Sequence, residues 1–319
     1  MHSLSLCAAL AAALSNIASA SLYGESYLNH SCVLHDPIPS CSKNATLANV
    51  DTCCTETFGG LVMSTQFWDT YTGLESEGQV LPKNSWTLHG LWPDFCNGSY
   101  TQYCDLSRQY DPSPSPSTLD NGAAIPPWKG PSIDSLIEPF GRKDLLAYMN
   151  KYWVGQAQKS NILWAHEFSK HATCYSTFDI PCYGPQSPAH YDILDFFTTA
   201  LLYFRHHPTY QWLAETGITP SNTTSYTLSN LQSALKRGAG ARPYIGCSGP
   251  RYNETDAGRG SMDDGYTVLD QIYYYMHVLG RPQDGMGVPV DASVEGSLSS
   301  CAKSEGGVWY YERASGSEV

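Results

Sequence analysis

The chain has 319 residues and a formal net charge of −12 at pH 7, which is long enough for one large or two modest domains. A chain this acidic cannot hold nucleic acid through a general basic surface, because the phosphate backbone requires positive charge opposite it. Any action on a polyanion would therefore need a local cationic site. Such a site would work best at acidic pH, where histidines carry charge.

The first 20 residues have the pattern of a secretory signal peptide. A short apolar run over residues 4–14 is followed by the small residues Ala18-Ser19-Ala20, which form a cleavage site. A membrane anchor is the alternative, but this run is too short to span a bilayer. No later segment is long and apolar enough to do so, and we expect no membrane partner. The protein would be secreted or, alternatively, vacuolar.

The cysteines and glycosylation sequons also indicate passage through the secretory route. Ten cysteines follow the predicted cleavage site, and an even count behind a signal peptide predicts up to five disulfides. Structural zinc would need paired C-x-x-C knuckles, and the sequence has none. Five N-x-[ST] sequons predict N-glycans, at Asn29, Asn44, Asn97, Asn222 and Asn253.

The first half of the mature chain predicts two strands. Residues 21–60 are rich in cysteine and turns, and we expect little regular structure there. Residues 60–68 have the apolar, aromatic character of a buried strand, and residues 85–92 predict a second. Strict alternation would place His89 and Leu91 on the same face of the second strand. Residues 92–94 would then leave the sheet as a loop.

The rest of the chain predicts mostly helices. Residues 111–131 are rich in Pro and Ser and could be an interdomain linker, but we expect a surface loop within one domain spanning residues 21–319. Helices are expected over 134–150, around 161–174, over 189–216 with a stop or a second helix at Pro208, and over 227–237 with Thr227 as cap and Gly238 as stop. Residues 266–279 predict strands. Mixed elements without regular alternation indicate an α+β fold.

The most chemically informative stretch is His166-Glu167-Phe168-Ser169-Lys170-His171-Ala172-Thr173-Cys174. On a helix, Glu167 and His171 are four residues apart and stack on one stripe, so the carboxylate could hold that imidazole. His166 and Lys170 form a second, cationic stripe. Zinc is an alternative, but metalloprotease histidines lie four residues apart, whereas His166 and His171 are five apart.

A partner for this stretch comes from the second predicted strand. A lone histidine such as His89 is more often structural, and aromatic residues are more often core. The combination of these residues favours a catalytic site. Two imidazoles can supply the acid and the base of an in-line displacement, and a neighbouring cation can offset charge on phosphoryl oxygens. Aromatic faces and one carboxylate, as in Trp92, Asp94 and Tyr100, suit an unstacked base.

Trp86-Thr87-Leu88-His89-Gly90-Leu91-Trp92-Pro93-Asp94 and the stretch His166–Cys174 resemble the two active-site segments of the ribonuclease T2 family, in an order similar to its fungal branch. The resemblance implies an α+β fold around a central antiparallel sheet packed by helices and stapled by disulfides. It also implies cleavage of single-stranded RNA with low base specificity, without metal or cofactor, through a 2′,3′-cyclic phosphate to 3′-phosphate ends. We expect a monomer.

The resemblance also implies roles for individual residues. His171 would be the general base and His89 the general acid, His166 would hold phosphate, and Glu167 and Lys170 would stabilise the pentacovalent centre. Trp92, Asp94 and Tyr100 would form the primary base site. Gln66 would belong to a second base site, or it is an ordinary polar residue of its strand.

The family's disulfide pattern would pair Cys32 with Cys54, Cys41 with Cys96, Cys53 with Cys182, Cys104 with Cys174, and Cys247 with Cys301. Phe168 and Ala172 depart from the Trp and Gly that many members have at these positions. Two other functions remain open. One is a secreted glycoprotein that binds RNA or a host partner without turnover, and the other is a zinc hydrolase.

Overall fold

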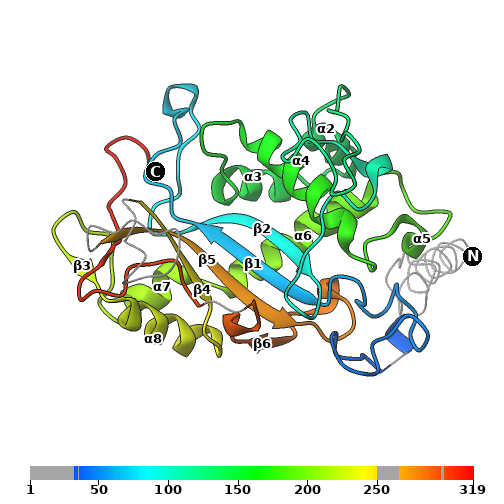
Figure 1. Ribbon diagram of the computed structural model, residues 1–319. Helices are drawn as coiled ribbons and strands as arrows, with labels where there is room; N and C mark the ends of the chain where they lie inside the picture. The colour runs from blue at the N-terminus through cyan, green and yellow to red at the C-terminus, as the bar shows by residue number, and fades with distance from the viewer. Residues whose placement is uncertain (1–31, 35, 250–265, 296–297) are drawn as a thin grey trace, which may run out of the picture.

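The computed structural model describes residues 32–34, 36–249, 266–295 and 298–319 (Figure 1). The predicted signal peptide and the sequons at Asn29 and Asn253 lie outside these residues. Within them, no helix is both long enough and apolar enough to cross a membrane.

A mainly antiparallel sheet forms the centre of the molecule. Its long strands are β1 (Leu61–Phe67), β2 (Thr87–Asp94) and β5 (Thr267–His277), with β1 between the other two. The shorter strands of the described part are β3 (Ser225–Tyr226), β4 (Tyr244–Ser248), β6 (Val288–Val290) and β7 (Val308–Trp309). β5 and β7 pair in parallel, and the other ladders are antiparallel. The predicted central antiparallel sheet and its two sequence-derived strands are confirmed.

Helices pack against this sheet and around the β2 edge (Figure 1). The α-helices are α2 (Ile133–Ile137), α3 (Lys143–Tyr152), α4 (Ser160–Lys170), α5 (Ile180–Tyr183), α6 (Tyr191–His206), α7 (Thr209–Ala214) and α8 (Leu228–Ala239). Short 3₁₀ helices are η1 (Cys32–Leu34), η2 (Glu75–Glu77), η3 (Leu106–Arg108), η4 (Glu138–Phe140), η5 (Ala172–Cys174), η6 (Pro282–Asp284) and η7 (Ala292–Glu295). The α+β class is confirmed.

Helix boundaries follow local signals, with two corrections. The single helix expected over residues 134–150 is interrupted by η4, where Pro139 lies at the start of the 3₁₀ turn and Gly141 ends it with φ of 70°. The break at Pro208 and the cap at Thr227, whose side chain accepts from the Asn230 N–H, are confirmed. α8 continues to Ala239 and is capped by Gly240 rather than stopping at Gly238.

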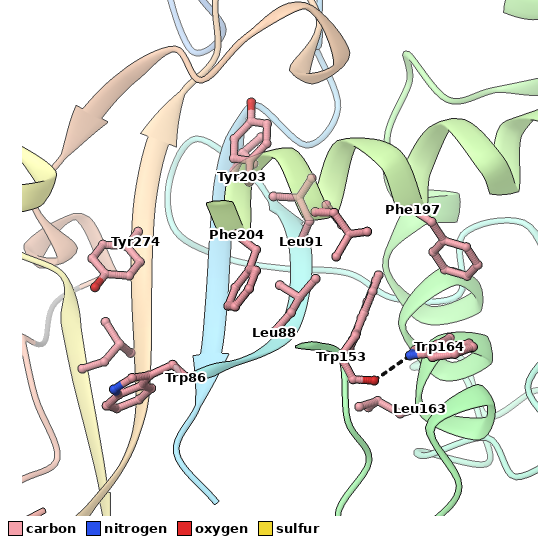
Figure 2. Packing of buried hydrophobic residues seen from close by; sticks show 14 of the residues in the cluster. Trp86, Leu88, Leu91, Trp153, Leu163, Trp164, Phe197, Tyr203, Phe204 and Tyr274 are labelled. Carbon is pink, nitrogen blue, oxygen red and sulfur yellow. Dashed lines mark hydrogen bonds between the residues drawn. The ribbon is translucent and has the colours of Figure 1, made fainter. Parts of the chain in front are cut away.

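The main core lies between the sheet and α6. Leu88 and Leu91 of β2 point toward Phe204 and its neighbours on α6, as Figure 2 shows. Trp153, which follows α3, is fully buried and its carbonyl accepts a hydrogen bond from the Trp164 indole of α4, at 2.8 Å. This contact fixes α4 relative to the end of α3. The catalytic candidates on α4 are therefore carried by a helix held from its buried side.

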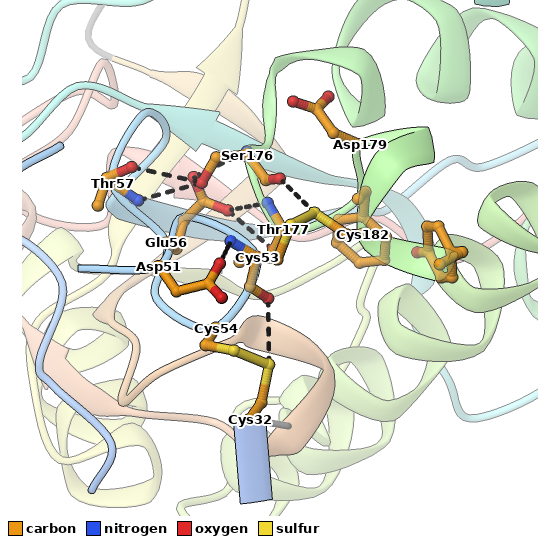
Figure 3. Close-up of a disulfide and its surroundings, with 12 residues drawn as sticks. Cys32, Asp51, Cys53, Cys54, Glu56, Thr57, Ser176, Thr177, Asp179 and Cys182 are labelled. Atoms are coloured by element: carbon orange, nitrogen blue, oxygen red, sulfur yellow. Dashed lines mark hydrogen bonds between the residues drawn. A yellow bond between two sulfur atoms is a disulfide. The ribbon is translucent and has the colours of Figure 1, made fainter. Parts of the chain in front are cut away.

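Five disulfides connect the pairs that the family resemblance implies, which confirms that expectation: Cys32–Cys54, Cys41–Cys96, Cys53–Cys182, Cys104–Cys174 and Cys247–Cys301. Figure 3 shows two of them beside the buried carboxylate of Glu56, which joins the N-terminal segment to the chain after η5. Cys104–Cys174 spans the Pro- and Ser-rich loop and joins the chain after β2 to η5.

Candidate active site

A β-bulge in β2 presents His89. Thr65 pairs with Gly90 and Gln66 pairs with Leu88, so His89 is the extra residue of β2. Leu88 and Leu91 both join the core, whereas His89 lines a cavity on the other side. This corrects the alternation that placed His89 and Leu91 on one face. β2 also continues through Asp94, so residues 92–94 are not a loop.

The bulge is held on both sides. The His89 carbonyl, which faces no strand partner at the bulge, accepts a hydrogen bond from the Trp153 indole at 2.7 Å. The Phe67 ring stacks on the imidazole, with 3.7 Å between ring centroids. His89 is therefore fixed through its backbone and its ring face, and its buried Nδ1 has no hydrogen-bond partner within the described residues.

The other half of the site lies at the C-terminal end of α4. His166, Glu167 and Lys170 belong to the last turns of the helix, and His171 is its C-cap residue. The helix expected up to Cys174 ends at Lys170 and is followed by η5. His171 keeps a helical hydrogen bond from its N–H to the Glu167 carbonyl, at 3.2 Å, so it stays on the same surface as the helical residues.

Glu167 is fully buried and has few partners. Its Oε2 accepts from the Trp92 indole at 2.6 Å. Its Oε1 lies 3.5 Å from His89 Nε2 and has no hydrogen bond within the described residues. His89, and not His171 as the helical spacing predicted, is thus within ion-pair distance of the carboxylate. Burial raises the pKa of Glu167 to about 7, against the lowering effect of His166, Trp92 and Lys170.

Gly90 makes room for this carboxylate. A Cβ at position 90 would lie 1.9 Å from Glu167 Oε2 and 2.5 Å from Trp92 Nε1. No side chain of the neighbouring residues could absorb such an overlap without breaking the hydrogen bond between Trp92 and Glu167. A glycine is therefore required where β2 passes the end of α4.

Trp92 contacts both candidate acid–base histidines. Its indole stacks on the His171 ring, with centroids 4.7 Å apart and planes 15° apart, and it meets the His89 ring edge-on at 4.6 Å. Burial lowers the pKa of His89 and His171 well below the usual value, and the positive charges of His166 and Lys170 lower both further. Both rings therefore change charge on the acidic side of their ordinary range.

One cavity of about 620 Å³ collects these groups. Every predicted site residue except Gln66 lines it: His89, Trp92, Asp94, Tyr100, His166, Glu167, Lys170 and His171. Tyr100 is 69% exposed at the cavity, whereas Asp94 is 6% exposed. Two segments that are distant in the sequence thus meet at one site.

Gln66 lies elsewhere. It is fully buried, its amide nitrogen donates to the His207 carbonyl at 2.8 Å, and its amide oxygen accepts from the Thr209 hydroxyl at 2.7 Å. Both ends of the amide are thus used inside the protein. This geometry favours the alternative interpretation of Gln66 as an ordinary polar residue of its strand, and its contact with a second base stays a prediction.

The structure adds residues that sequence reasoning missed. Tyr273 of β5 lines the cavity beside Trp92, and Ser115 and Pro116 reach it from the Pro- and Ser-rich loop. Asp111 lies behind His166, with 2.8 Å between its Oδ2 and His166 Nδ1. The predicted strand at 266–279 was the only sequence signal for any of them. A lone acid at the start of a Pro-rich stretch gives no signal of a catalytic neighbour.

His166, Glu167 and His171 also form the one group of potential metal donors in the described chain, with donor atoms within 4.8 Å of one another. The surroundings do not fit a dication well. Trp92 already donates to Glu167, His166 Nδ1 faces Asp111, and the Lys170 ammonium shares the cavity. Zinc is bound by Cys, His and carboxylate groups, and an ammonium beside them would repel the ion.

The chain was compared with known proteins. The model of the Ribonuclease T2 family matches residues 59–278. Ribonuclease Le2 of Lentinula edodes is 36% identical over 263 residues, which cover 82% of this chain and 90% of that protein. Ribonuclease T2 of Aspergillus oryzae is 33% identical over 279 residues, covering 87% and 83%. The crystal structure of Actibind, described as a T2 ribonuclease, is similar with a TM-score of 0.67 and 33% identity, covering 88% of this chain and 97% of that one.

Proposed function

Because the chain belongs to the ribonuclease T2 family and is an endoribonuclease, we propose that it cleaves single-stranded RNA by metal-free acid–base transphosphorylation at the cavity between β2 and α4. One observation carries this proposal. Two imidazoles from different elements, His89 and His171, contact the same Trp92 indole and line one cavity that also holds a lysine. Such a pair can act as base and acid on one phosphodiester.

In the first step His171 takes the proton of the ribose 2′-OH, and the 2′-oxygen forms a bond to phosphorus. His89 gives a proton to the 5′-oxygen as the bond from phosphorus to that oxygen breaks, which leaves a 2′,3′-cyclic phosphate. In the second step the roles reverse, and water opens the cyclic ester to a 3′-phosphate. The lowered pKa of both rings places this exchange on the acidic side of neutrality.

Three further groups would act on the phosphoryl oxygens. Lys170 and His166 supply positive charge next to the pentacovalent centre. Below a pH of about 7, the pKa of Glu167, its carboxyl group holds a proton and can donate from Oε1, the oxygen that Trp92 does not use. A neutral carboxyl kept as a donor by an apolar site is an established catalytic device.

The base on the 5′ side of the scissile bond would bind at Trp92, Asp94 and Tyr100. Tyr100 offers an exposed ring for stacking, and Asp94 offers a carboxylate to an exocyclic amino group. One face of Trp92 is already covered by His171, so the indole would contact the base through its remaining face or edge. Stacking surfaces of this kind tolerate all bases, which suits low base preference.

Export, glycosylation and a single-domain monomer complete the proposal. Five disulfides are typical of a protein that folds in an oxidising compartment, either secreted or vacuolar. Asn44, Asn97 and Asn222 are exposed and could carry N-glycans. Cys104–Cys174 bridges the two sides of the Pro- and Ser-rich loop, as expected if that loop belongs to one domain over residues 21–319.

The test is cleavage of a dinucleoside phosphate in excess chelator, followed by product identification. We expect turnover in chelator, a transient 2′,3′-cyclic phosphate and an acidic, bell-shaped pH profile. Direct formation of a 5′-phosphate, or loss of activity on metal removal, would rule out the mechanism. Folded protein that binds RNA without cleaving it between pH 3 and 8 would instead identify a binding glycoprotein.

A further inference from the structure

One buried carboxylate touches the site without reaching the cavity. Asp111 is 1% exposed, and its Oδ2 lies 2.8 Å from His166 Nδ1. The Tyr103 hydroxyl donates to the same oxygen at 3.1 Å, and the Ser113 N–H donates to Oδ1 at 2.8 Å. The Gln109 side chain hydrogen-bonds both the N–H and the carbonyl of Asp111. Both the backbone and the side chain of Asp111 are thus fixed.

The segment that carries Asp111 is tied to α4 before the loop begins. The Tyr103 N–H donates to the Lys170 carbonyl at 2.9 Å, and the Tyr110 N–H donates to the Ser169 hydroxyl at 2.8 Å. The disulfide Cys104–Cys174 joins the same two stretches. The distance between Asp111 and His166 is therefore set by the framework and does not depend on the rest of the Pro- and Ser-rich loop.

We propose that Asp111 is a positioning residue for His166, an inference that rests on the proposed role of His166 in holding the phosphate. An ionised carboxylate can only accept hydrogen bonds, so His166 Nδ1 must carry a hydrogen. Nε2 is then the nitrogen presented to the cavity, where the imidazolium form of the ring has a second N–H to donate to a phosphoryl oxygen. A flipped ring, or the other tautomer, would lose the bond to Asp111.

Tyr103 extends this arrangement to the rim of the cavity. Its hydroxyl accepts from the Ser115 N–H at 3.1 Å while it donates to Asp111, and Ser115 itself lines the cavity. The chain of contacts thus runs from the cavity wall through Tyr103 and Asp111 to His166.

A purely structural role for Asp111 predicts a different outcome in a double-mutant cycle. If Asp111 only held the loop to α4, its loss would reduce activity whether or not His166 is present. If it acts by orienting His166, its loss has no further effect once that ring is gone. The cycle therefore separates the two roles.

The experiment measures kcat and KM of the full-length protein on a dinucleoside phosphate for Asp111→Asn, His166→Ala and the double variant. We expect Asp111→Asn to lower kcat/KM by about 10- to 100-fold, by analogy with the loss when the group that orients a metal-bound histidine is removed. Added to His166→Ala, it should change kcat/KM by less than about twofold. Asp120→Asn, an exposed carboxylate in the same loop, is the matched control and should behave as wild type.

Imidazole ¹⁵N spectra report which nitrogen of His166 carries the hydrogen. A purely structural role of Asp111 would leave this unchanged. We expect the neutral form of the wild-type His166 ring to carry its hydrogen on Nδ1, and Asp111→Asn to abolish that preference. If Asp111→Asn does not fold, Tyr103→Phe replaces it in the cycle, with an expected loss of about threefold to tenfold that also vanishes without His166.

Equal losses from Asp111→Asn in both backgrounds, or an unchanged His166 tautomer, would overturn the inference. So would full activity of Asp111→Asn alongside an inactive His166→Ala. If His166→Ala itself keeps full activity, the proposed role of His166 fails, and the spectra alone then decide whether Asp111 orients the ring.

Discussion

Glu56 and Glu167 are both fully buried carboxylates, and they lie in opposite kinds of surroundings. Glu56 accepts six hydrogen bonds, from the N–H groups of Phe58, Gly59, Ser176 and Thr177 and the hydroxyls of Ser176 and Thr177. Glu167 accepts one, from Trp92, and its other oxygen faces His89 at 3.5 Å. Figure 3 shows Ser176 and Thr177, which supply four of these donors, beside Glu56.

The difference in hydrogen bonding means that Glu56 stabilises the fold, whereas Glu167 is held in place at a cost in stability. Six donors replace the water that Glu56 gives up, so its burial contributes to stability and crosslinks the N-terminal segment to residues 176–177. Glu167 is kept in place with too few donors, which is unfavourable for folding and is expected where a group must meet a substrate. The shortage of donors around the buried carboxylate accompanies a pKa of Glu167 that burial raises to about 7.

The largest effect should come from Glu167→Gln. The amide keeps the shape and a hydrogen-bond donor, but it is a weaker donor than a carboxylic acid and cannot give up a proton to a phosphoryl oxygen, so we expect kcat to fall by about 10²- to 10³-fold, as for removal of one group that stabilises the transition state. Stability should stay equal or rise, because a poorly satisfied buried acid is removed. Steady-state kinetics and urea unfolding at one pH test both halves. A stable variant with wild-type kcat would show that Glu167 is not part of the machinery.

The second effect is a pH-dependent gap in stability between wild type and Glu167→Gln. Since the folded pKa, about 7, exceeds the unfolded value of 4.5, the folded state retains a proton that the unfolded chain releases between these values. Wild-type stability is therefore lost, relative to the variant, as pH rises from about 4.5 to 7. At 1.4 kcal/mol per pKa unit the gap should approach about 3 kcal/mol.

Urea unfolding of both proteins at several values between pH 4.5 and 7.5 measures this gap. His89 and His171 act in the opposite direction, since their lowered pKa values destabilise the fold as pH falls below their ordinary range. They are present in both proteins, so the subtraction isolates position 167 together with its coupling to His89. A gap that does not change with pH would contradict the assigned pKa shift.

Glu56→Gln should lower stability and leave kcat unchanged, the opposite of Glu167→Gln. The amide nitrogen would face the Thr177 N–H, which leaves a buried donor without an acceptor and costs about 2 kcal/mol. Activity per folded molecule should remain that of wild type, because Glu56 does not line the active-site cavity. Denaturant midpoints and kcat of the folded fraction test this pair of expectations. A loss of kcat with unchanged stability would place Glu56 in the site.

The sequence predicted elements well where local signals were strong. The Pro208 break and the Thr227 cap act within one turn of the chain, so they could be seen without tertiary information. The bulge at His89 could not be predicted from the sequence, because it depends on how β2 pairs with β1. The split helix at Pro139 was within reach, since proline lacks the N–H that a helix interior requires.

The site was predicted where residues cluster in sequence and missed where the fold brings them together. His89 and the α4 residues lie in two short, chemically dense segments, and the structure joins them in one cavity. Asp111 and Tyr273 reach the site through pairing and packing that no local pattern encodes. For Gln66 the sequence left two interpretations open, because a polar residue in a strand beside the site can also make its hydrogen bonds in the core, as this one does.

The smallest effect tests the redundancy around Glu56. Ser176→Ala removes one hydroxyl donor at 3.0 Å, while the N–H groups of Phe58, Gly59 and Ser176 still reach the same carboxylate oxygen. The oxygen stays satisfied, so we expect a loss of about 1 kcal/mol and unchanged kcat. Trp92→Phe is the matched change at Glu167, where no second donor exists among the described residues, and it should impair activity. A Ser176→Ala variant destabilised as strongly as Glu56→Gln would mean that the six donors act as one unit, and that the satisfaction of Glu56 is cooperative rather than redundant.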